Sequence, residues 1–329
     1  MALTWDDITG KVNKHIIPRL VDNVYKSSPL FTRLRTRNAE RFEGGTSIRH
    51  PIAYAELNGG AFQRGGTFNI SYVQTDTALE VVPKYYYVNV TLFGTDNVLA
   101  RGPEAAMNYV ESKMVNASGK MAKNLGSDAF LDGTGVNSGT INLDGLDQAL
   151  DNGSNGSGTS YASYGGITRT DLGVANGTNN AGINAYADCS TAVFTMALLQ
   201  TAYGGAWFGN EHVDLIVTTQ AIWNIIWNKI LPQQRFMEES TDVAKIGFQS
   251  MRWNGASICV DQYCPANYIY GLNTKYIQFW ISTLPKYQFG FTGFKEAQNT
   301  DDVAGQYLFA GNLLIPAPRL MFKLGAITS

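Results

Sequence analysis

The sequence predicts an α+β protein in which an extended β hairpin precedes one long helix and a larger α/β region. Three observations lead to this class. Alternating apolar residues between positions 45 and 93 indicate strands, apolar residues at helical spacing over 103–131 indicate one long helix, and short strand and helix patterns recur over 190–300. With 329 residues, of which 44% are hydrophobic, the chain can bury a substantial core.

The net charge gives no indication of nucleic-acid binding, and the apolar runs are too short for a membrane span. The net charge is −2, and only 16% of residues are charged, against roughly 25% in ordinary soluble domains. Such a low charge suits a surface that is covered by neighbouring molecules. No apolar run reaches the about 18 residues of a membrane helix, and the N-terminus lacks a signal-peptide pattern. We therefore expect a cytosolic chain with three reduced cysteines, Cys189, Cys259 and Cys264.

Residues 1–41 predict a basic, amphipathic arm. Residues 1–50 contain nine basic and five acidic side chains. Pro18 stands where a helix can begin, apolar residues follow it at helical spacing, and Pro29 ends the segment. The favoured interpretation is an arm that docks on a neighbouring molecule. The alternative is non-specific contact with the phosphates of a nucleic acid.

Residues 45–83 predict a long hairpin with a glycine-rich tip. Ile48, His50, Ile52 and Tyr54 alternate along the outgoing strand. Glycine pairs at 59–60 and 65–66 indicate the tip, and the returning strand is expected over 67–73 and 79–82. A hairpin with so few core-type residues near its tip is not stable alone. It needs a surface of its own domain or of another subunit.

The clearest strand and the clearest helix follow the hairpin. Residues 85–93 predict a strand with Val88, Val90 and Leu92 on one face. The helix is expected over 103–131, with an apolar stripe that packs on a sheet. Gly119 and Gly126 weaken this helix by up to about 1 kcal/mol each, and so indicate close approach of another element.

The rest of the chain predicts loops followed by a compact α/β region. Residues 132–185 are rich in Gly, Asn, Ser and Thr, and 152–160 and 176–182 are expected to be surface loops. Helices are expected over 194–203 and 220–231, with an aromatic loop over 204–209 between them. Strands are expected over 213–217, 257–261, 268–272, 277–281, 288–291 and 313–324, the last interrupted by two prolines.

A search for catalytic and metal-binding patterns gives little. The three histidines are far apart, and Cys259 and Cys264 have no second cluster that would complete a zinc site. Asp144, Asp147 and Asp151 miss the spacing of a calcium loop and are interpreted as solvated loop acids. No nucleotide-binding or nucleophile motif occurs. We therefore expect no enzymatic activity, no catalytic residues, no cofactor and no metal.

The order of these elements resembles the major capsid protein fold of tailed double-stranded-DNA bacteriophages, which encapsulins share. A basic arm, a glycine-tipped hairpin, a strand, a long helix, a loop-rich α/β region and a final strand follow one another over essentially the whole chain. The stretches that carry the resemblance are 47–68, 85–94, 129–133, 165–167, 215–218 and 319–327.

The resemblance implies a division of the chain into five segments. They are an N-terminal arm (1–44), an extended loop (45–83), a peripheral domain with a spine helix (84–135), an axial domain (136–305) and a C-terminal strand that returns to the peripheral domain (306–329).

The resemblance also implies three groups of contact residues. The tip of the extended loop would contact an adjacent subunit through Glu56, Asn58, Gly59, Gly60, Phe62, Gln63, Arg64, Gly65 and Gly66. The arm would do so through Arg19, Val21, Tyr25, Arg33, Arg35 and Arg37. Gly204, Gly205, Trp207 and Phe208 are candidates for a loop near the capsomer axis.

One departure from the family concerns cross-linking. Some members join subunits through a lysine on the extended loop, but this chain has no lysine from position 27 to 83. Arg64 cannot substitute for it, because a guanidinium stays protonated. We expect non-covalent contacts instead, in which Glu56 and Arg64 pair with charges on a neighbour. The chain starts almost directly at the arm, so we expect either that scaffolding comes from a separate protein or that a prodomain has been removed.

The function implied by the resemblance is that of a major capsid protein, assembling into pentamers and hexamers of an icosahedral phage head around double-stranded DNA. Its implied partners are copies of itself, scaffolding, portal and decoration proteins, and non-specifically contacted DNA, with no membrane. The location would be the virion, after assembly in the host cytoplasm. The alternatives are an encapsulin-like compartment shell and a β-rich surface or binding protein.

Overall fold

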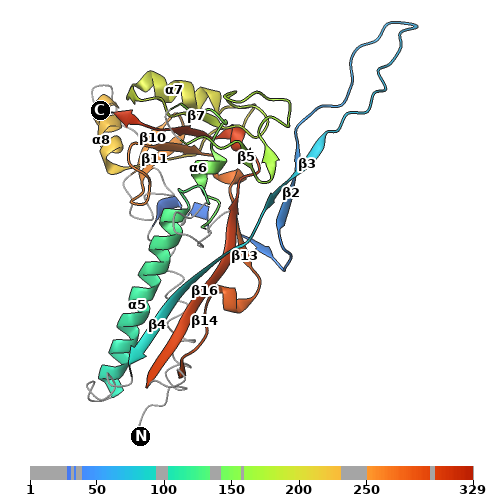
Figure 1. Ribbon diagram of the computed structural model, residues 1–329. Coiled ribbons are helices and arrows are strands. Elements are labelled where there is room, and N and C mark those ends of the chain that lie inside the picture. The colour runs from blue at the N-terminus through green and yellow to red at the C-terminus, as the bar shows by residue number, and fades with distance from the viewer. Residues whose placement is uncertain are drawn as a thin grey trace.

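The computed structural model describes residues 28–30, 33–34, 39–93, 103–133, 142–156, 159–230, 250–296 and 301–328. Figure 1 shows an elongated molecule with three parts: a stem formed by one long helix beside a sheet, a rounded body at one end of the stem, and a hairpin that projects away from both. The predicted helix after Pro18 lies outside the described residues, as do Arg19, Val21, Tyr25, Arg35 and Arg37.

The sheet of the stem is built on two long antiparallel strands, β4 (Lys84–Phe93) and β16 (Asp302–Leu314). They pair continuously from Lys84 opposite Gly311 to Phe93 opposite Asp302. Shorter strands lie along the other edge of β16 or beyond it: β13 (Gln278–Ser282), β14 (Gln288–Phe291), β15 (Lys295–Glu296) and β1 (Ala39–Phe42), which pairs with β13 in parallel.

The long helix α5 (Pro103–Asp128) covers one face of this sheet (Figure 1). Val90 and Leu92 of β4 are buried toward it, and the Tyr307 hydroxyl of β16 lies 3.3 Å from the Met114 sulfur of α5. The predicted apolar stripe is confirmed for the described side chains Val110, Met114, Ala117, Met121, Leu125 and Ala129, all of which are buried. Strand and helix therefore form a two-layer stem with one shared core.

The body contains a second, mixed sheet in the order β10-β11-β9-β12-β17-β7. Helices α7 (Met196–Gly205) and α8 (Gln220–Ile230) bury their apolar faces in its core. Thr195 caps α7 by accepting a hydrogen bond from the Leu198 amide at 3.1 Å. The strands are β7 (Tyr186–Asp188), β9 (Leu215–Thr218), β10 (Ser250–Trp253), β11 (Ala256–Val260), β12 (Ile269–Leu272) and β17 (Phe322–Leu324).

The remaining elements are short. They are α6 (Leu146–Ala149), the hairpin β5 (Ser163–Tyr164) and β6 (Ile167–Thr168), the pair β8 (Ala192–Val193) and β18 (Ile327–Thr328), and the 3₁₀ turns Thr274–Tyr276, Pro285–Tyr287 and Pro318–Leu320.

The projecting hairpin is paired only at its base. Strands β2 (Ile48–Ala53) and β3 (Asp76–Val81) run antiparallel, from Ile48 opposite Val81 to Ala53 opposite Asp76. The predicted strand over 67–73 is wrong, since residues 54–75 form no strand. Extended backbone becomes a strand only when it finds a pairing partner, and this segment has none among the described residues.

Two further predictions about the C-terminal third need correction. Strand β16 begins at Asp302, although the sequence indicated a strand only from position 313. Gly305 and Gly311 interrupt its apolar pattern because a side chain there would collide: a Cβ at Gly305 would lie 2.3 Å from the Phe291 ring. The predicted return of the C-terminal segment to the stem is made by β16, which pairs with β4, whereas β17 and β18 pair in the body after the chain turns at residues 316–320.

The two glycines of α5 differ in their surroundings. A Cβ at Gly126 would lie 2.4 Å from the Tyr263 ring, which confirms the close approach expected there. A Cβ at Gly119 would meet nothing within 4 Å, so the same expectation is wrong for that position. Gly126 therefore serves packing, and Gly119 only weakens the helix.

Gly126→Ala should lower the free energy of unfolding by about 1–3 kcal/mol, because overpacking outweighs the gain in helix propensity. Gly119→Ala is the matched control and should raise it by up to about 1 kcal/mol. Urea denaturation of both variants measures the difference. Equal effects at the two positions would contradict the packing role of Gly126.

Candidate assembly surfaces

The tip of the hairpin exposes apolar side chains that its own chain does not cover. Every residue from 56 to 72 is exposed, and Ile70 and Tyr72 retain 93% and 91% of their accessible surface. Phe62 and Phe68 meet edge to face at 5.0 Å but remain exposed themselves. Figure 1 shows this segment far from the stem and the body. Apolar surface held in this way is typical of a protein contact.

The structure brings the predicted tip residues together at the end of this projection. The Gly66 amide donates to the Gln63 carbonyl at 2.9 Å, which closes the turn at the tip. The Asn58 side chain donates to the Ser71 carbonyl at 2.8 Å and ties the two arms together. No larger hydrogen-bond network fixes the tip among the described residues. Its conformation can therefore adapt to a partner.

Four apolar residues of this surface were not singled out from the sequence: Leu57, Phe68, Ile70 and Tyr72. Phe68, Ile70 and Tyr72 are spaced two residues apart, which places them on one side of an extended chain. That spacing was visible in the sequence, but it was assigned to a strand within the same subunit.

The base of the hairpin is fixed to the body. Leu79 and Val81 are buried, and the Glu80 amide donates to the Gly165 carbonyl at 2.8 Å. Gly165 has φ +56, and a Cβ there would lie 2.7 Å from Leu79. Hydrogen bonds from Ser47 and then from Arg49 hold the pKa of the Glu80 carboxyl below its usual range. Buried contacts at its base therefore set the direction of the hairpin, whereas no described segment packs against its tip.

The described part of the N-terminal arm packs on its own chain. Leu30 and Leu34 are buried in the main core. The Ser28 hydroxyl donates to Asp261, a buried carboxylate whose pKa is raised by desolvation. Arg33, predicted to contact a neighbour, pairs with Asp214 at 2.9 Å. Within its own chain Arg33 therefore already has a carboxylate partner, and its contact with a neighbouring subunit stays a prediction.

The aromatic segment after α7 is exposed, as expected for Trp207 and Phe208. The Trp207 ring stacks on His212 with centroids 5.3 Å apart, and the Arg319 guanidinium lies 3.9 Å from the centre of the Phe208 ring. Gly204 and Gly205 belong to the last turn of α7 rather than to this loop. A Cβ at Gly205 would lie 2.7 Å from the Asn180 amide, so Gly205 is a packing position.

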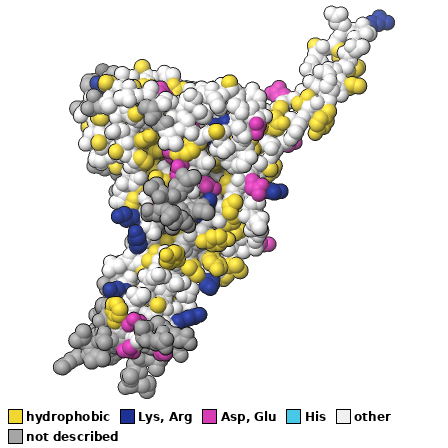
Figure 2. Space-filling view, in the orientation of Figure 1, with side chains coloured by type: hydrophobic (Ala, Val, Ile, Leu, Met, Phe, Trp, Pro, Cys, Tyr) yellow, Lys and Arg dark blue, Asp and Glu magenta, His cyan; other side chains and the backbone are white. Residues whose placement is uncertain are grey.

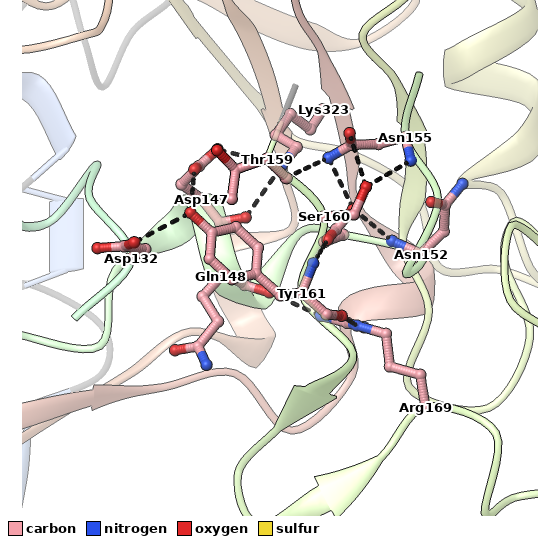
Figure 3. Close-up of polar contacts among 11 residues, drawn as sticks. Asp132, Asp147, Gln148, Asn152, Asn155, Thr159, Ser160, Tyr161, Arg169 and Lys323 are labelled. Atoms are coloured by element: carbon pink, nitrogen blue, oxygen red, sulfur yellow. Dashed lines mark hydrogen bonds and ion pairs between the residues drawn. The ribbon is translucent and has the colours of Figure 1, made fainter. Parts of the chain in front are cut away.

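A buried polar network joins the body to the stem (Figure 3). At its centre is Arg169, which is fully buried. Its guanidinium donates to the carbonyls of Gln148 at 2.6 Å, Ile183 at 2.8 Å and Tyr161 at 2.9 Å. Burial lowers the pKa of Arg169 to about 10, which still leaves it charged at neutral pH. The arginine therefore holds three segments together by donating hydrogen bonds to their buried backbone carbonyls, which water cannot reach.

The acids of this region are held by specific partners, and their prediction as solvated loop acids is wrong. Asp151 is buried and accepts from the Asn155 side chain at 2.8 Å and from the Asn152 amide at the same distance. Asp147 pairs with the buried Lys323 at 3.1 Å. Asp144 pairs with Lys84 at 3.5 Å and accepts from Asn312 at 2.7 Å.

The predicted surface loops 152–160 and 176–182 need the same correction in part. Asn152 and Asn155 are buried, and the Asn152 side chain donates to Asn179 at 2.6 Å. Their polar side chains form hydrogen bonds with buried backbone groups and so take the place of water. Composition alone cannot separate this role from a solvated loop.

The three cysteines are buried and form no disulfide in this structure. Burial raises the pKa of Cys189 to about 11 and of Cys259 to about 12, so neither forms the reactive thiolate near neutral pH. No group of three potential metal ligands occurs within the described ranges. Over the same ranges, no helix has the length and apolarity needed to cross a membrane.

Arg169→Leu should lower the free energy of unfolding by about 3–5 kcal/mol, because it leaves three buried carbonyls without their donors and removes a positive charge near the buried Asp151. Tyr161→Phe is the milder control: it removes only the hydroxyl that donates to Asp147 at 2.9 Å, and about 1 kcal/mol should be lost. Chemical denaturation measures both. A loss no larger for Arg169→Leu than for Tyr161→Phe would contradict the central role of the arginine.

The sequence itself matches no protein-family model and no curated protein. Solved structures do match. A chain of the cyanophage A-1(L) capsid asymmetric unit aligns with a TM-score of 0.66 at 15% identity, covering 93% of this chain and 94% of that chain. A chain of the capsid of a native GTA particle aligns with a TM-score of 0.58 at 11% identity, covering 90% of each.

A chain of the structure of Gordonia phage Cozz aligns with a TM-score of 0.52 at 9% identity, covering 95% of this chain and 86% of that chain. At such low identity the likeness concerns the fold. The predicted fold is confirmed over nearly the whole length: the chain has the α+β fold of tailed-phage major capsid proteins.

Proposed function

We propose that this chain is the major capsid protein of a tailed double-stranded-DNA bacteriophage. It assembles into the pentamers and hexamers of an icosahedral head. The observation that carries the proposal is the hairpin, whose base is fixed by buried contacts while its apolar tip has no cover within the described part of the chain. A second copy of the same chain supplies that cover. The fold shared with capsid structures supports this interpretation.

The strength of the contact fits reversible assembly. Burying one large apolar side chain contributes on the order of 1.5–3 kcal/mol. Association of two molecules costs an estimated 4–15 kcal/mol in lost freedom before any net affinity appears. The few side chains of one tip therefore cannot hold two subunits together alone. Many such contacts in a closed shell can, and a weak single contact lets misplaced subunits leave.

The proposed contacts are non-covalent. The hairpin carries no lysine between positions 27 and 83, and Arg64 is not a nucleophile. Glu56 and Arg64 are both exposed at the tip and are proposed to pair with charges on the neighbouring subunit. Such exposed pairs contribute about 0–1 kcal/mol each, so they orient the tip more than they hold it.

The remaining assignments belong to the same proposal. The stem corresponds to a peripheral domain and the body to an axial domain, with Trp207 and Phe208 at a capsomer axis. The chain has no enzymatic role, occupies the virion after assembly in the host cytoplasm, and works with separate scaffolding, portal and decoration proteins. The basic arm contacts neighbouring subunits, and contact with packaged DNA is non-specific.

The double variant Ile70→Asn, Tyr72→Asn tests the tip. Because both side chains are almost fully exposed, subunit stability should change by less than about 0.5 kcal/mol. Closed shells should nevertheless be lost or should require a several-fold higher protein concentration. Val115→Gln, which replaces an exposed apolar residue of α5, is the control and should assemble normally. Light scattering and negative-stain microscopy measure assembly.

Microscopy of the unmodified protein tests the wider proposal. Large shells with pentamers and hexamers that contain DNA are expected from infected cells. Small particles filled with a protein cargo would support an encapsulin-like shell instead. Monomers that persist at high concentration, with scaffolding protein present, would count against either kind of shell.

A further inference from the structure

The chain contains five Asn-Gly pairs, at positions 58–59, 152–153, 155–156, 176–177 and 254–255. In such a pair the backbone nitrogen of the glycine can attack the side-chain carbonyl carbon of the asparagine. Glycine favours this attack because it has no Cβ to shield the nitrogen and because its backbone turns freely. The reaction at each pair therefore depends on whether the fold leaves the glycine nitrogen and the asparagine side chain free to meet.

The two pairs in the buried polar network are fixed through their asparagines. Asn152 and Asn155 are both buried. The Asn152 side chain donates to Asn179 at 2.6 Å and accepts from the Ser154 amide at 2.9 Å. The Asn155 side chain donates to the Asp151 carboxylate at 2.8 Å. Moving either side chain onto the glycine that follows it would break buried hydrogen bonds, which is costly.

Two further pairs have an exposed asparagine but a fixed glycine. The Gly177 amide donates to the Asn152 carbonyl at 2.9 Å, so the nitrogen that would attack is already bound. Asn254 and Gly255 form the two-residue turn between β10 and β11, with φ of 47° and 90°. The paired strands on either side hold this turn in one conformation.

Asn58 and Gly59 lie on the hairpin tip without such constraints. Both are exposed, and a Cβ at Gly59 would meet nothing within 4 Å. Residues 54–75 form no strand, and among the described residues no hydrogen bond holds the Gly59 amide. Figure 2 shows the projecting hairpin clear of the stem and the body. The Asn58 side chain donates to the exposed Ser71 carbonyl at 2.8 Å, a bond that water can replace. This pair therefore has the freest glycine nitrogen of the five.

We propose that Asn58 is a site of spontaneous deamidation in the unassembled subunit, and that the change disables the hairpin tip. The Gly59 nitrogen forms a bond to the side-chain carbonyl carbon of Asn58, and the bond from that carbon to the side-chain nitrogen breaks. The proton of the Gly59 amide passes through solvent to the leaving nitrogen, which departs as ammonia. Water then opens the succinimide ring and gives aspartate or isoaspartate. The effect on assembly rests on the proposed function, whereas the reaction does not.

The product removes the contact that joins the two arms of the tip. Asn58 donates to the Ser71 carbonyl, but an ionised carboxylate has no proton to donate. Two oxygen acceptors would then face each other, so the arms separate at this point. Ser71 lies between Ile70 and Tyr72, whose exposed side chains form the proposed contact. A neighbour that covers this surface would also have to desolvate the new charge, which is unfavourable. Deamidation therefore limits how long a free subunit can assemble.

Peptide mapping by mass spectrometry tests the site. Free subunits and closed shells are incubated in mildly alkaline buffer, and conversion is measured at all five Asn-Gly pairs. In free subunits Asn58 should convert several-fold faster than the asparagine of any other pair. Conversion at Asn58 no faster than at Asn176 or Asn254 would overturn the proposal.

The comparison with shells separates this proposal from the proposed function. In closed shells Asn58 should convert several-fold more slowly than in free subunits, because a neighbour covers the tip. Equal conversion in both would count against that cover, which belongs to the proposed function, and would leave the reaction itself established. Should the unmodified protein form no shells, the proposed function fails, while conversion in free subunits still decides whether Asn58 is the reactive site.

Substitution separates the reaction from its consequence. Gly59→Ala should slow conversion at Asn58 several-fold, since a Cβ shields the attacking nitrogen. Asn58→Asp carries the charge of the product and should need a several-fold higher protein concentration to form shells, as measured by light scattering. Asn176→Asp makes the same charge change at an exposed pair outside the tip, and this matched control should assemble as the unmodified protein does. Normal assembly of Asn58→Asp would refute the effect on the tip.

Discussion

The antiparallel pairing of β4 with β16 is the contact on which the rest of the structure depends. Ten consecutive residue pairs join the first third of the chain to its last part. The hairpin strand β3 ends at Val81, directly before β4 starts at Lys84, so the sheet sets where the projection begins. β16 leads through the turn at 316–320 into the strands of the body. One ladder therefore connects the stem, the hairpin and the body.

The body is attached to this ladder by buried polar groups as well as by apolar packing. Asn312 of β16 donates to both Asp144 and the Val82 carbonyl at 2.7 Å. Lys84 of β4 pairs with the same aspartate. Further from the sheet, Arg169 and Lys323 hold the loops that follow α5. Polar networks that are fully paired fix one arrangement of loops more narrowly than apolar contact does.

The described surfaces of the hairpin and the stem differ in chemistry. The hairpin tip exposes Phe62, Phe68, Ile70 and Tyr72, and no other described segment covers them. The stem sheet exposes Tyr85 and Tyr87. Exposed apolar and aromatic side chains that lie together are typical of contacts with protein.

The sequence by itself determined the local elements and their order. The apolar spacing of α5, the alternation in β4 and the glycine-rich tip each follow from a periodicity that a few neighbouring residues express, so they could be predicted. The exposed aromatics Trp207 and Phe208 were predicted from the glycine-rich loop around them. Strands β9, β11 and β12 of the body agree with the predictions within about two residues, which is the usual uncertainty of strand ends, whereas β7 and β10 were not predicted.

Only the tertiary structure decided what depends on distant partners. The sequence could not show that 67–73 stays unpaired, because a strand exists only with a neighbour. It could not show that Asp147 and Asp151 are bound to Lys323 and Asn155 rather than to water, because those partners come from other segments. It could not show that β16 begins at Asp302, because the glycine at 305 is required by the Phe291 ring beside it, which comes from another strand. Periodicity is a local property, whereas pairing and burial depend on which distant residues the fold brings together.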